Sequence, residues 1–304
     1  MAAFSIQKVN FLFKIKLHAV LIALLVGGCA AMTPNLPPVT DAPTGNHNNG
    51  RIIWHDLLTS TPAESRKFYG ELFGWEFEKP GLDIGFGDES SYMLIRHDGN
   101  LIGGMFDANA PNKKVDISQW VTVMSTADID AAVGRVVAAG GEVLTPPTDV
   151  GSRGVLAVVA GPDRAIMALI QTREGDPAEQ QPEMNQWLWN ELWTNDVDRA
   201  TAFYQELAGF EVEDHEVRDL DRSYRVLKVD DQPRAAILAN PFEDERPVWV
   251  NYIRVDDPAA ITAQVENLGG KILVEAQPRS IGGEVAFIAG PSGAGVAIQT
   301  WPLK

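Results

Sequence analysis

The stretch "WHDLLTSTPAESRKFYGELFGW", from Trp54 to Trp75, decides the fold of this chain. Its first residues predict a β-strand, and a short turn leads from them into a helix. Pro62 suits the first turn of that helix, where a backbone donor has no partner to lose. Phe68 and Leu72 lie four residues apart and give the helix one apolar face. Gly74 is typical of a helix C-terminus, so the stretch predicts a strand, a turn and an amphipathic helix.

The same stretch returns later in the chain as "WNELWTNDVDRATAFYQELAGF". At an offset of 135, ten of 25 positions from Trp54 to Glu78 are identical to those from Trp189 to Glu213. A second block repeats at an offset of 129, with Trp120 matching Trp249. This period is too long for a solenoid and indicates a duplicated domain. We expect domains at residues 50–173 and 186–302, which fold separately and are joined by the polar linker "EGDPAEQQPEMN" at residues 174–185.

Each copy contains two halves of the same order. In the first half of copy one, the strand and helix above precede strands at "WEFE", "SYMLIRHDG" and "LIGGMF". In the second half, a strand "WVTVMS" and a helix "DIDAAVGRVVAAG" precede strands at "EVLTPP", "GVLAVVAG" and "AIMALIQT". The double glycine after each such helix is typical of a C-cap. The order β-α-β-β-β is therefore expected four times in the chain.

The pattern resembles the vicinal oxygen chelate superfamily, also called the glyoxalase/bleomycin resistance/extradiol dioxygenase superfamily. The resemblance is carried by "WHDLLTSTPAESRKFYGELFGW", "AAGGEVLTPPTDVGSRG" and "AGPDRAIMALIQT" in copy one. In copy two it is carried by "WNELWTNDVDRATAFYQELAGF", "LGGKILVEAQPRSIGG" and "AGPSGAGVAIQT". The resemblance implies an α+β fold of two tandem domains. In each domain, two paired βαβββ modules form a curled sheet around a cleft.

Members of that family usually hold a divalent metal in the cleft, through histidines near the module starts and glutamates on the last strands. In copy one, the resemblance places His55 at the first ligand position, Val121 at the third and Ala168 at the fourth, while "LIGGMF" offers no carboxylate at the second. In copy two, the corresponding residues are Asn190, Val250, Ala297 and the strand "RAAILAN". His55 is thus the only usual donor left, and one imidazole does not hold a metal against water. We expect no metal and no other cofactor; a divalent metal is the alternative.

Four residues are candidates for contact with a ligand in the clefts: His55, Asn190, Trp120 and Trp249. His55 could also be a strand residue with a structural partner, or a general base without metal, because its pKa lies near neutrality. The tryptophans recur at equivalent strand positions, which is also typical of core packing.

The N-terminal residues predict export and lipidation. Lysines precede the apolar run "AVLIALLVGGCAAM", which is too short to span a bilayer but suits a signal peptide. The run contains "LVGGC", which resembles a bacterial lipobox and makes Cys29, the only cysteine, the lipid attachment site. We therefore expect a signal peptide at residues 1–28 and a flexible tether at 29–49. The protein would be extracytoplasmic and lipid-anchored, at the outer membrane and facing the periplasm in a Gram-negative cell.

The formal net charge of −16 argues against nucleic acid as a partner. Two function classes remain from the sequence. The first is a membrane-tethered glyoxalase-like protein that binds a small apolar or aromatic ligand, or serves as a scaffold for a protein partner. The second is a metal-dependent lyase, isomerase or dioxygenase of the glyoxalase type. The ligand count favours the first, although fold alone does not assign chemistry.

Overall fold

The computed structural model describes residues 35–81, 92–108, 117–217, 222–242, 245–279 and 282–301. The predicted signal peptide and Cys29 lie outside these ranges. No helix within the described ranges has both the length and the apolar character needed to cross a membrane.

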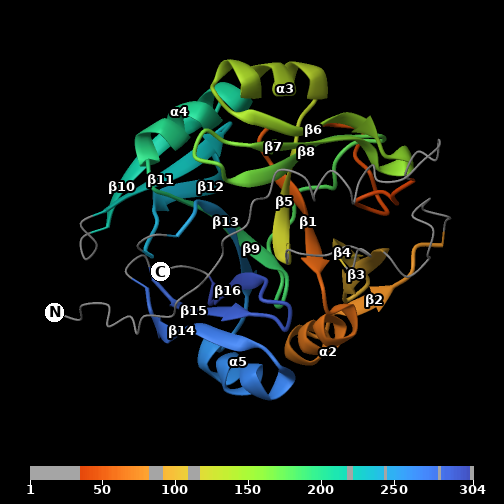
Figure 1. Cartoon of the computed structure of the whole chain (residues 1–304), viewed down its shortest axis with the longest axis vertical. Helices are drawn as coiled ribbons and strands as arrows, with labels where there is room; N and C mark the ends of the chain where they lie inside the picture. Colours follow the sequence, from red (N-terminus) through yellow and green to blue (C-terminus); the bar gives the residue numbers. More distant parts are fainter. Residues whose placement is uncertain are drawn as a thin grey trace.

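The described residues form four modules with the predicted order, one strand, one helix and three strands (Figure 1). The first module contains β1 (Ile52–Thr59), α2 (Pro62–Phe73), β2 (Glu76–Glu78), β3 (Tyr92–His97) and β4 (Asn100–Asp107). The second contains β5 (Gln119–Ser125), α3 (Ile129–Ala138), β6 (Glu142–Asp149), a 3-10 turn (Gly151–Arg153), β7 (Gly154–Ala160) and β8 (Ile166–Thr172). The third contains β9 (Trp187–Thr194), α4 (Val197–Ala208), β10 (Glu211–Val217), β11 (Arg222–Val229) and β12 (Gln232–Ala239). The fourth contains β13 (Val248–Arg254), α5 (Pro258–Val265), a 3-10 turn (Glu266–Leu268), β14 (Lys271–Pro278), β15 (Glu284–Ala289) and β16 (Gly295–Gln299).

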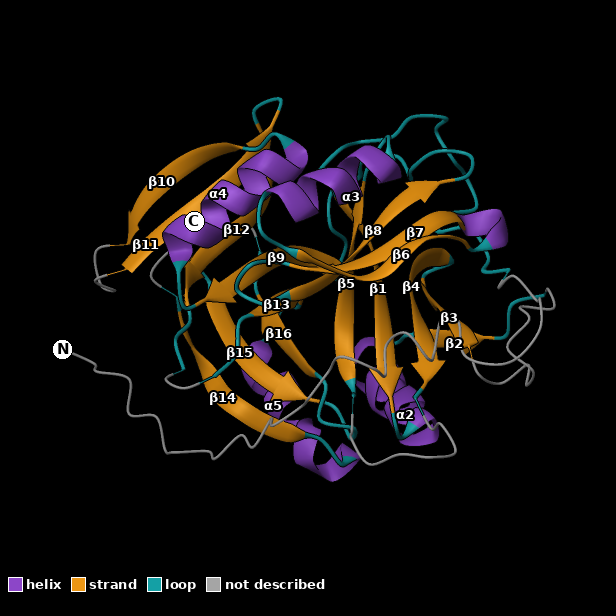
Figure 2. Cartoon of the chain, turned by 45° about the horizontal axis from the view of Figure 1, so that its top comes forward, coloured by secondary structure: helices purple, strands orange, loops and turns teal. Residues whose placement is uncertain are grey.

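The modules pair into two mixed sheets of eight strands, as expected for two tandem α+β domains. The strand order is β2-β3-β4-β1-β5-β8-β7-β6 in the first sheet and β10-β11-β12-β9-β13-β16-β15-β14 in the second. Within the first module, β1 runs parallel to β4, and it joins the second module by antiparallel pairing with β5. Figure 2 shows that both sheets are strongly curved and that the helices gather where one sheet meets the other. We call the helix-covered face of each sheet its outer face and the opposite face its inner face.

The two copies share their hydrophobic cores, which the repeat alone does not predict. One buried cluster joins α2 and outer-face residues of the first module, such as Leu57, to Ile253, Val265 and Ile298 of the fourth module. A second cluster joins α3 and the outer face of the second module to α4 and the third module. Accordingly, α2 lies beside α5 and α3 beside α4 (Figure 1). Each outer hydrophobic core therefore requires both copies of the repeat.

The double glycines explain how closely the copies pack. Gly140 and Gly269 adopt φ of 82° and 83°, the left-handed conformation expected of a C-cap. The glycine that follows has a different purpose: a Cβ on Gly270 would strike the ring of Phe68, which belongs to the other copy. At the matching position of the repeat, a Cβ on Gly141 would strike the ring of Phe203. The second glycine of each pair thus makes room for the helix of the other copy.

The predicted tether is ordered over its described part. Leu36 donates its backbone N–H to Val150 at 2.8 Å and accepts from the backbone N–H of Arg153 at 3.0 Å. Leu36 and Val39 are buried, with 1% and 3% exposure. Further on, Asp176 of the predicted linker accepts hydrogen bonds from the Asn48 backbone and the Ser125 hydroxyl. Residues 35–49 and the start of the linker therefore belong to the fold, because apolar side chains and a buried carboxylate fix them.

Candidate functional site

His55 and Asn190 do not line the inner faces, and the expectation that they contact a ligand there must be corrected. Successive residues of a strand point to opposite faces. On β1, Trp54 and Asp56 point to the inner face, so His55 points outward. The outer faces meet here, and His55 Nε2 donates to Asn190 Oδ1 at 2.8 Å. The imidazole also stacks on Trp187, with 4.1 Å between ring centroids.

This seam between the sheets is buried and follows the symmetry of the repeat. Beside the His55–Asn190 pair, Thr122 Oγ1 donates to Asn251 Oδ1 at 2.7 Å. His55 Nδ1 has no hydrogen-bond partner among the described residues. Burial lowers the pKa of His55 to about 4, although its hydrogen bond to Asn190 acts in the opposite direction. The imidazole is therefore neutral near pH 7 and joins the two domains structurally.

Trp120 and Trp249 also lie on the outer faces. Trp120 Nε1 donates to Tyr69 Oη at 2.9 Å, and Trp249 Nε1 donates to Tyr204 Oη at 3.0 Å. Both indoles are buried in the two cores that the copies share. All four candidates therefore stabilise the packing between the copies.

The chemistry of the inner faces is carried by residues that the sequence analysis did not single out. On the first sheet, Arg153 Nη2 donates to Tyr92 Oη at 2.6 Å, and Arg153 Nη1 lies 3.4 Å from Asp56 Oδ2. Asp56 Oδ1 accepts from Trp54 Nε1 at 2.9 Å and from Tyr92 Oη at 3.0 Å. Burial raises the pKa of Asp56 and outweighs the charge of Arg153. Gly104 gives this cluster room, because a Cβ there would strike both Tyr92 and Asp56.

The second sheet carries a tighter version of the same cluster. Glu191 is fully buried and accepts from Arg279 Nη2 at 2.5 Å, from Tyr252 Oη at 2.5 Å and from Tyr224 Oη at 2.8 Å. Trp193 Nε1 donates to the same carboxylate at 3.2 Å. Burial alone would raise the pKa of Glu191, but Arg279 and the hydroxyl donors hold it below its usual value. The pair is therefore ionised, with every carboxylate oxygen satisfied.

The two arginines differ in how far they are covered. The Arg153 side chain has no exposed surface, whereas 14% of the Arg279 side chain is exposed. Burial alone would lower the pKa of Arg279, but Glu191 raises it, so the guanidinium stays charged. Trp189, whose Nε1 donates to Tyr224 Oη at 3.0 Å, and Phe242 are also only partly buried. The inner face of the second sheet thus combines a charged planar donor with accessible aromatic rings.

The donors on these faces do not fit a divalent metal. Near Asp56 lie three residues at positions where the family resemblance would place metal ligands. They are Gly104, Val121 and Ala168, and none of them has a side-chain donor. A guanidinium lies beside the buried carboxylate of each cluster, and its positive charge would repel a cation. Among the described residues, no group of three His, Cys, Asp or Glu side chains could hold a metal ion.

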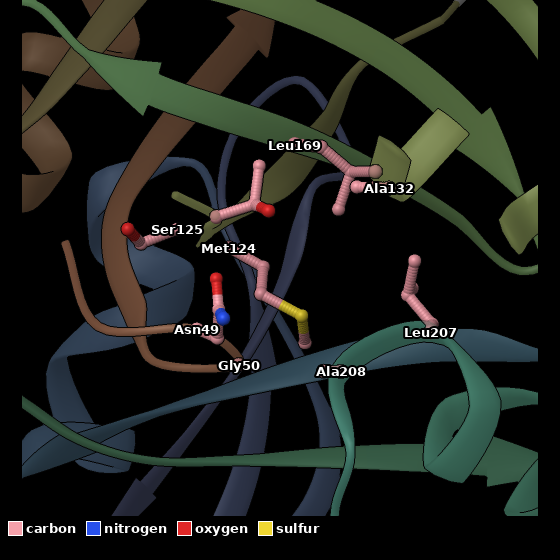
Figure 3. Close-up of a pocket in the computed structure, with 9 residues that line it drawn as sticks. Asn49, Gly50, Met124, Ser125, Ala132, Leu169, Leu207 and Ala208 are labelled. Carbon is pink, nitrogen blue, oxygen red and sulfur yellow. The ribbon is translucent and has the colours of Figure 1, made fainter. Parts of the chain in front are cut away.

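A small hollow lies elsewhere, between the first domain and the end of α4 (Figure 3). Asn49, Met124, Leu169 and Leu207 surround it, and its empty space is about 200 Å³ including open solvent. Ligand sites usually have about 300–1,000 Å³. The hollow has no charged side chain that could orient a ligand, whereas the inner face of the second sheet carries the partly exposed guanidinium of Arg279.

The sequence carries a signal for the carboxylates. Asp56 and Glu191 are both acidic at the 135-residue offset, in "WHDL" and "WNEL", and both lie two residues from a tryptophan that shares their face. The arginines lack such a signal, because they hold different places in the repeat. Arg153 directly precedes Gly154, while Arg279 lies four residues before Gly283, the match of Gly154. Only the three-dimensional structure brings both guanidinium groups to the carboxylates.

Comparison with known proteins identifies one family. The family model described as "Glyoxalase/Bleomycin resistance protein/Dioxygenase superfamily" matches residues 51–167 and 187–298. CFP32 of Mycobacterium tuberculosis, named as a glyoxylase, is 30% identical over 250 residues, covering 82% of this chain and 94% of that protein. The anthracycline biosynthesis protein DnrV of Streptomyces peucetius is 29% identical over 262 residues, covering 82% of this chain and 92% of that protein.

Solved structures share the fold at low sequence identity. The Mn(II)-bound glyoxalase from Novosphingobium aromaticivorans superposes with a TM-score of 0.58 at 16% identity, covering 85% of this chain and 84% of that one. A catechol 2,3-dioxygenase superposes with a TM-score of 0.54 at 14% identity, covering 84% of this chain and 94% of that one. At this identity the likeness establishes the architecture alone.

Proposed function

Because this chain belongs to the Glyoxalase/Bleomycin resistance protein/Dioxygenase superfamily, we propose that it is a metal-independent member that binds a small planar ligand on the inner face of the second sheet. One observation carries the proposal: the charged Arg279 remains partly exposed near the ring of Tyr224, whose hydroxyl accepts a hydrogen bond from the partly exposed Trp189. Aromatic rings stack on planar ligands, and a guanidinium donates hydrogen bonds to carbonyl or carboxylate oxygens. The ligand therefore has an aromatic or quinone ring with an oxygen acceptor at its edge.

The relatives support this ligand class. DnrV is named for anthracycline biosynthesis, and anthracyclines are planar ring systems with carbonyl oxygens. The donor chemistry of both inner faces supports metal independence, since the buried carboxylate of each cluster is already held by arginine and tyrosine. Elemental analysis of protein purified without chelator is expected to give far less than one equivalent of manganese, iron, zinc or nickel. A stoichiometric metal would contradict the proposal.

Binding is tested by calorimetry with menadione, an uncharged planar quinone, as the probe. Trp189→Leu removes the aromatic ring and is expected to weaken binding about tenfold, since a stacked ring contributes about 0.5–1.5 kcal/mol beyond its area. Arg279→Lys keeps the charge but loses the planar donor fork, so it is expected to weaken binding too. The control is Val137→Ala, because Val137 is 60% exposed on α3, away from the inner face of the second sheet. Equal affinity in Trp189→Leu and wild type would exclude this site.

Localisation is part of the same proposal: the chain is exported and held at a membrane by lipid on Cys29. The support is the sequence, in which the only cysteine follows "LVGG". Stable anchoring needs more than one acyl chain, which lipoprotein processing supplies. Cys29→Ser is expected to leave the precursor unprocessed or to release the protein into the soluble fraction. Membrane retention of a normally processed Cys29→Ser variant would refute the anchor.

A further inference from the structure

The inner face of the first sheet carries the same kind of cluster as the proposed site, yet it is covered. Both faces have a carboxylate on the first strand of the domain, a tyrosine hydroxyl bonded to it and an arginine, from the second module in one domain and from the fourth in the other. Trp54 is 1% exposed, while its repeat partner Trp189 remains partly exposed. The difference between the faces lies in what covers the first one.

The cover is the chain's own segment Asn35–Val39. The side chains of Leu36 and Val39 lie in one buried cluster with Trp54, Tyr92 and other inner-face residues. Arg153 Nε donates to the backbone carbonyl of Pro37 at 2.8 Å. The segment thus offers the arginine a carbonyl oxygen and offers the aromatic rings an apolar body.

We infer that the inner face of the first sheet is a second ligand site, which the segment Asn35–Val39 occupies as an internal ligand. The inference rests on the proposed function, because it assigns the first face the chemistry proposed for the second. In the first domain, Arg153 uses its Nε for a carbonyl and its two other nitrogens for Tyr92 and Asp56. In the second domain, Nη1 and Nη2 of Arg279 hold Gln299 and Glu191. The occupied site therefore indicates the ligand class of both: an apolar body with a carbonyl oxygen that accepts from arginine.

The inference predicts unequal sites and a change in stoichiometry. Wild-type protein binds one menadione per chain, since the segment fills the first site. The double variant Leu36→Ser, Val39→Ser removes the apolar side chains that hold the segment, so calorimetry is expected to show two menadione sites per chain. The control is Ala42→Ser, because Ala42 is exposed, follows the segment Asn35–Val39 by three residues and does not belong to the buried inner-face cluster. The Ala42→Ser variant should bind one menadione per chain, as the wild type does.

Arginine variants assign each site. Adding Arg153→Lys to the double variant is expected to weaken the new site at least severalfold and to leave the other unchanged, and adding Arg279→Lys is expected to do the reverse. A synthetic peptide with the wild-type sequence of residues 35–39, added in excess to the double variant, should restore a stoichiometry of one. If the double variant loses its cooperative unfolding transition, Val39→Thr, which keeps the side-chain shape, replaces it.

The outcomes separate this inference from the proposed function. A stoichiometry of one in the double variant, with the segment shown to be released by its new susceptibility to protease, would overturn the inference and leave the proposed function standing. No binding to wild type, with one Arg153-dependent site in the double variant, would overturn the proposed function and support the inference. No menadione binding to either protein would overturn both.

Discussion

At the scale of single residues, the position of His55 shows how one residue of strand register decides chemistry. A shift of one place exchanges the faces of a strand. The histidine therefore contacts Asn190 and Trp187 between the sheets, while its neighbour Asp56 lies beside Arg153 on the inner face. His55 and Asp56 are both polar and buried, so residue type alone does not tell which of the two faces a ligand. Asp56 lies two residues from Trp54 and shares its face of the strand, and this alternation decides that Asp56, not His55, lies on the inner face.

The buried imidazole predicts a pH dependence of stability. The pKa of His55 is about 4 in the folded protein against the ordinary 6.5, so the unfolded chain binds more protons between these values. The free energy of unfolding that depends on a neutral His55 is fully present above the ordinary pKa. It is lost as the pH falls from there toward the pKa of His55 in the folded protein. Between about pH 7 and about pH 5 the loss is about 2 kcal/mol.

The test compares wild type with His55→Asn, which places the residue of the second copy at this position. The free energy of unfolding in urea, measured at both pH values, is expected to fall less in the variant by about that amount. Glu191 titrates below this window because its pKa is lowered, so it does not interfere. The same pH dependence in both proteins would mean that another group is responsible.

At the scale of elements, the sequence predicted nearly every helix and strand, because caps, glycines and apolar spacing are local signals. The helix start was predicted at Pro62 and the helix end at Gly74, and both are confirmed, with Gly74 at φ 70°. The inner-face clusters were not predictable in this way. Arg153 and Arg279 reach them from unmatched positions in two loops, and the burial of Leu36 depends on contacts more than a hundred residues away.

Gly104 on β4 provides a test of how the inner-face cluster is packed. Gly104→Ala places a methyl group against Tyr92 and Asp56, and such overpacking typically costs about 1–3 kcal/mol. The matched control is Gly134→Ala in α3, where a Cβ meets no atom within 4 Å. It is expected to stabilise by up to about 1 kcal/mol through helix propensity. Urea denaturation of both variants measures the difference, and equal midpoints would show that the strand adjusts without cost.

At the scale of the whole molecule, the repeat predicts the duplication but not that the copies share their hydrophobic cores. The repeat predicts two copies, and the family model matches both. What the repeat does not reveal is that the outer faces are too apolar to be left exposed to water. Each copy buries its helices against the other copy, and Phe68 and Phe203 fit over the glycines Gly270 and Gly141 across the interface. The repeated unit is therefore smaller than the unit that shares one hydrophobic core.

This arrangement predicts the behaviour of a chain cut at the linker. Residues 179–181 are exposed and suit a protease, whereas Asp176 before them is buried and hydrogen-bonded. Cutting there should leave the two fragments associated, because both hydrophobic cores need both copies. The nicked protein is expected to elute as one species in size-exclusion chromatography, to give two fragments only in denaturant, and to unfold in one thermal transition.

Phe68→Ala, which empties a fully buried position at the interface, should lower the free energy of unfolding by about 3–5 kcal/mol and allow the nicked halves to separate. Its control is Val137→Ala, since Val137 is 60% exposed and should change neither property. If the nicked wild-type halves separated under native conditions and each kept its own transition, the shared cores would not be what holds the molecule together.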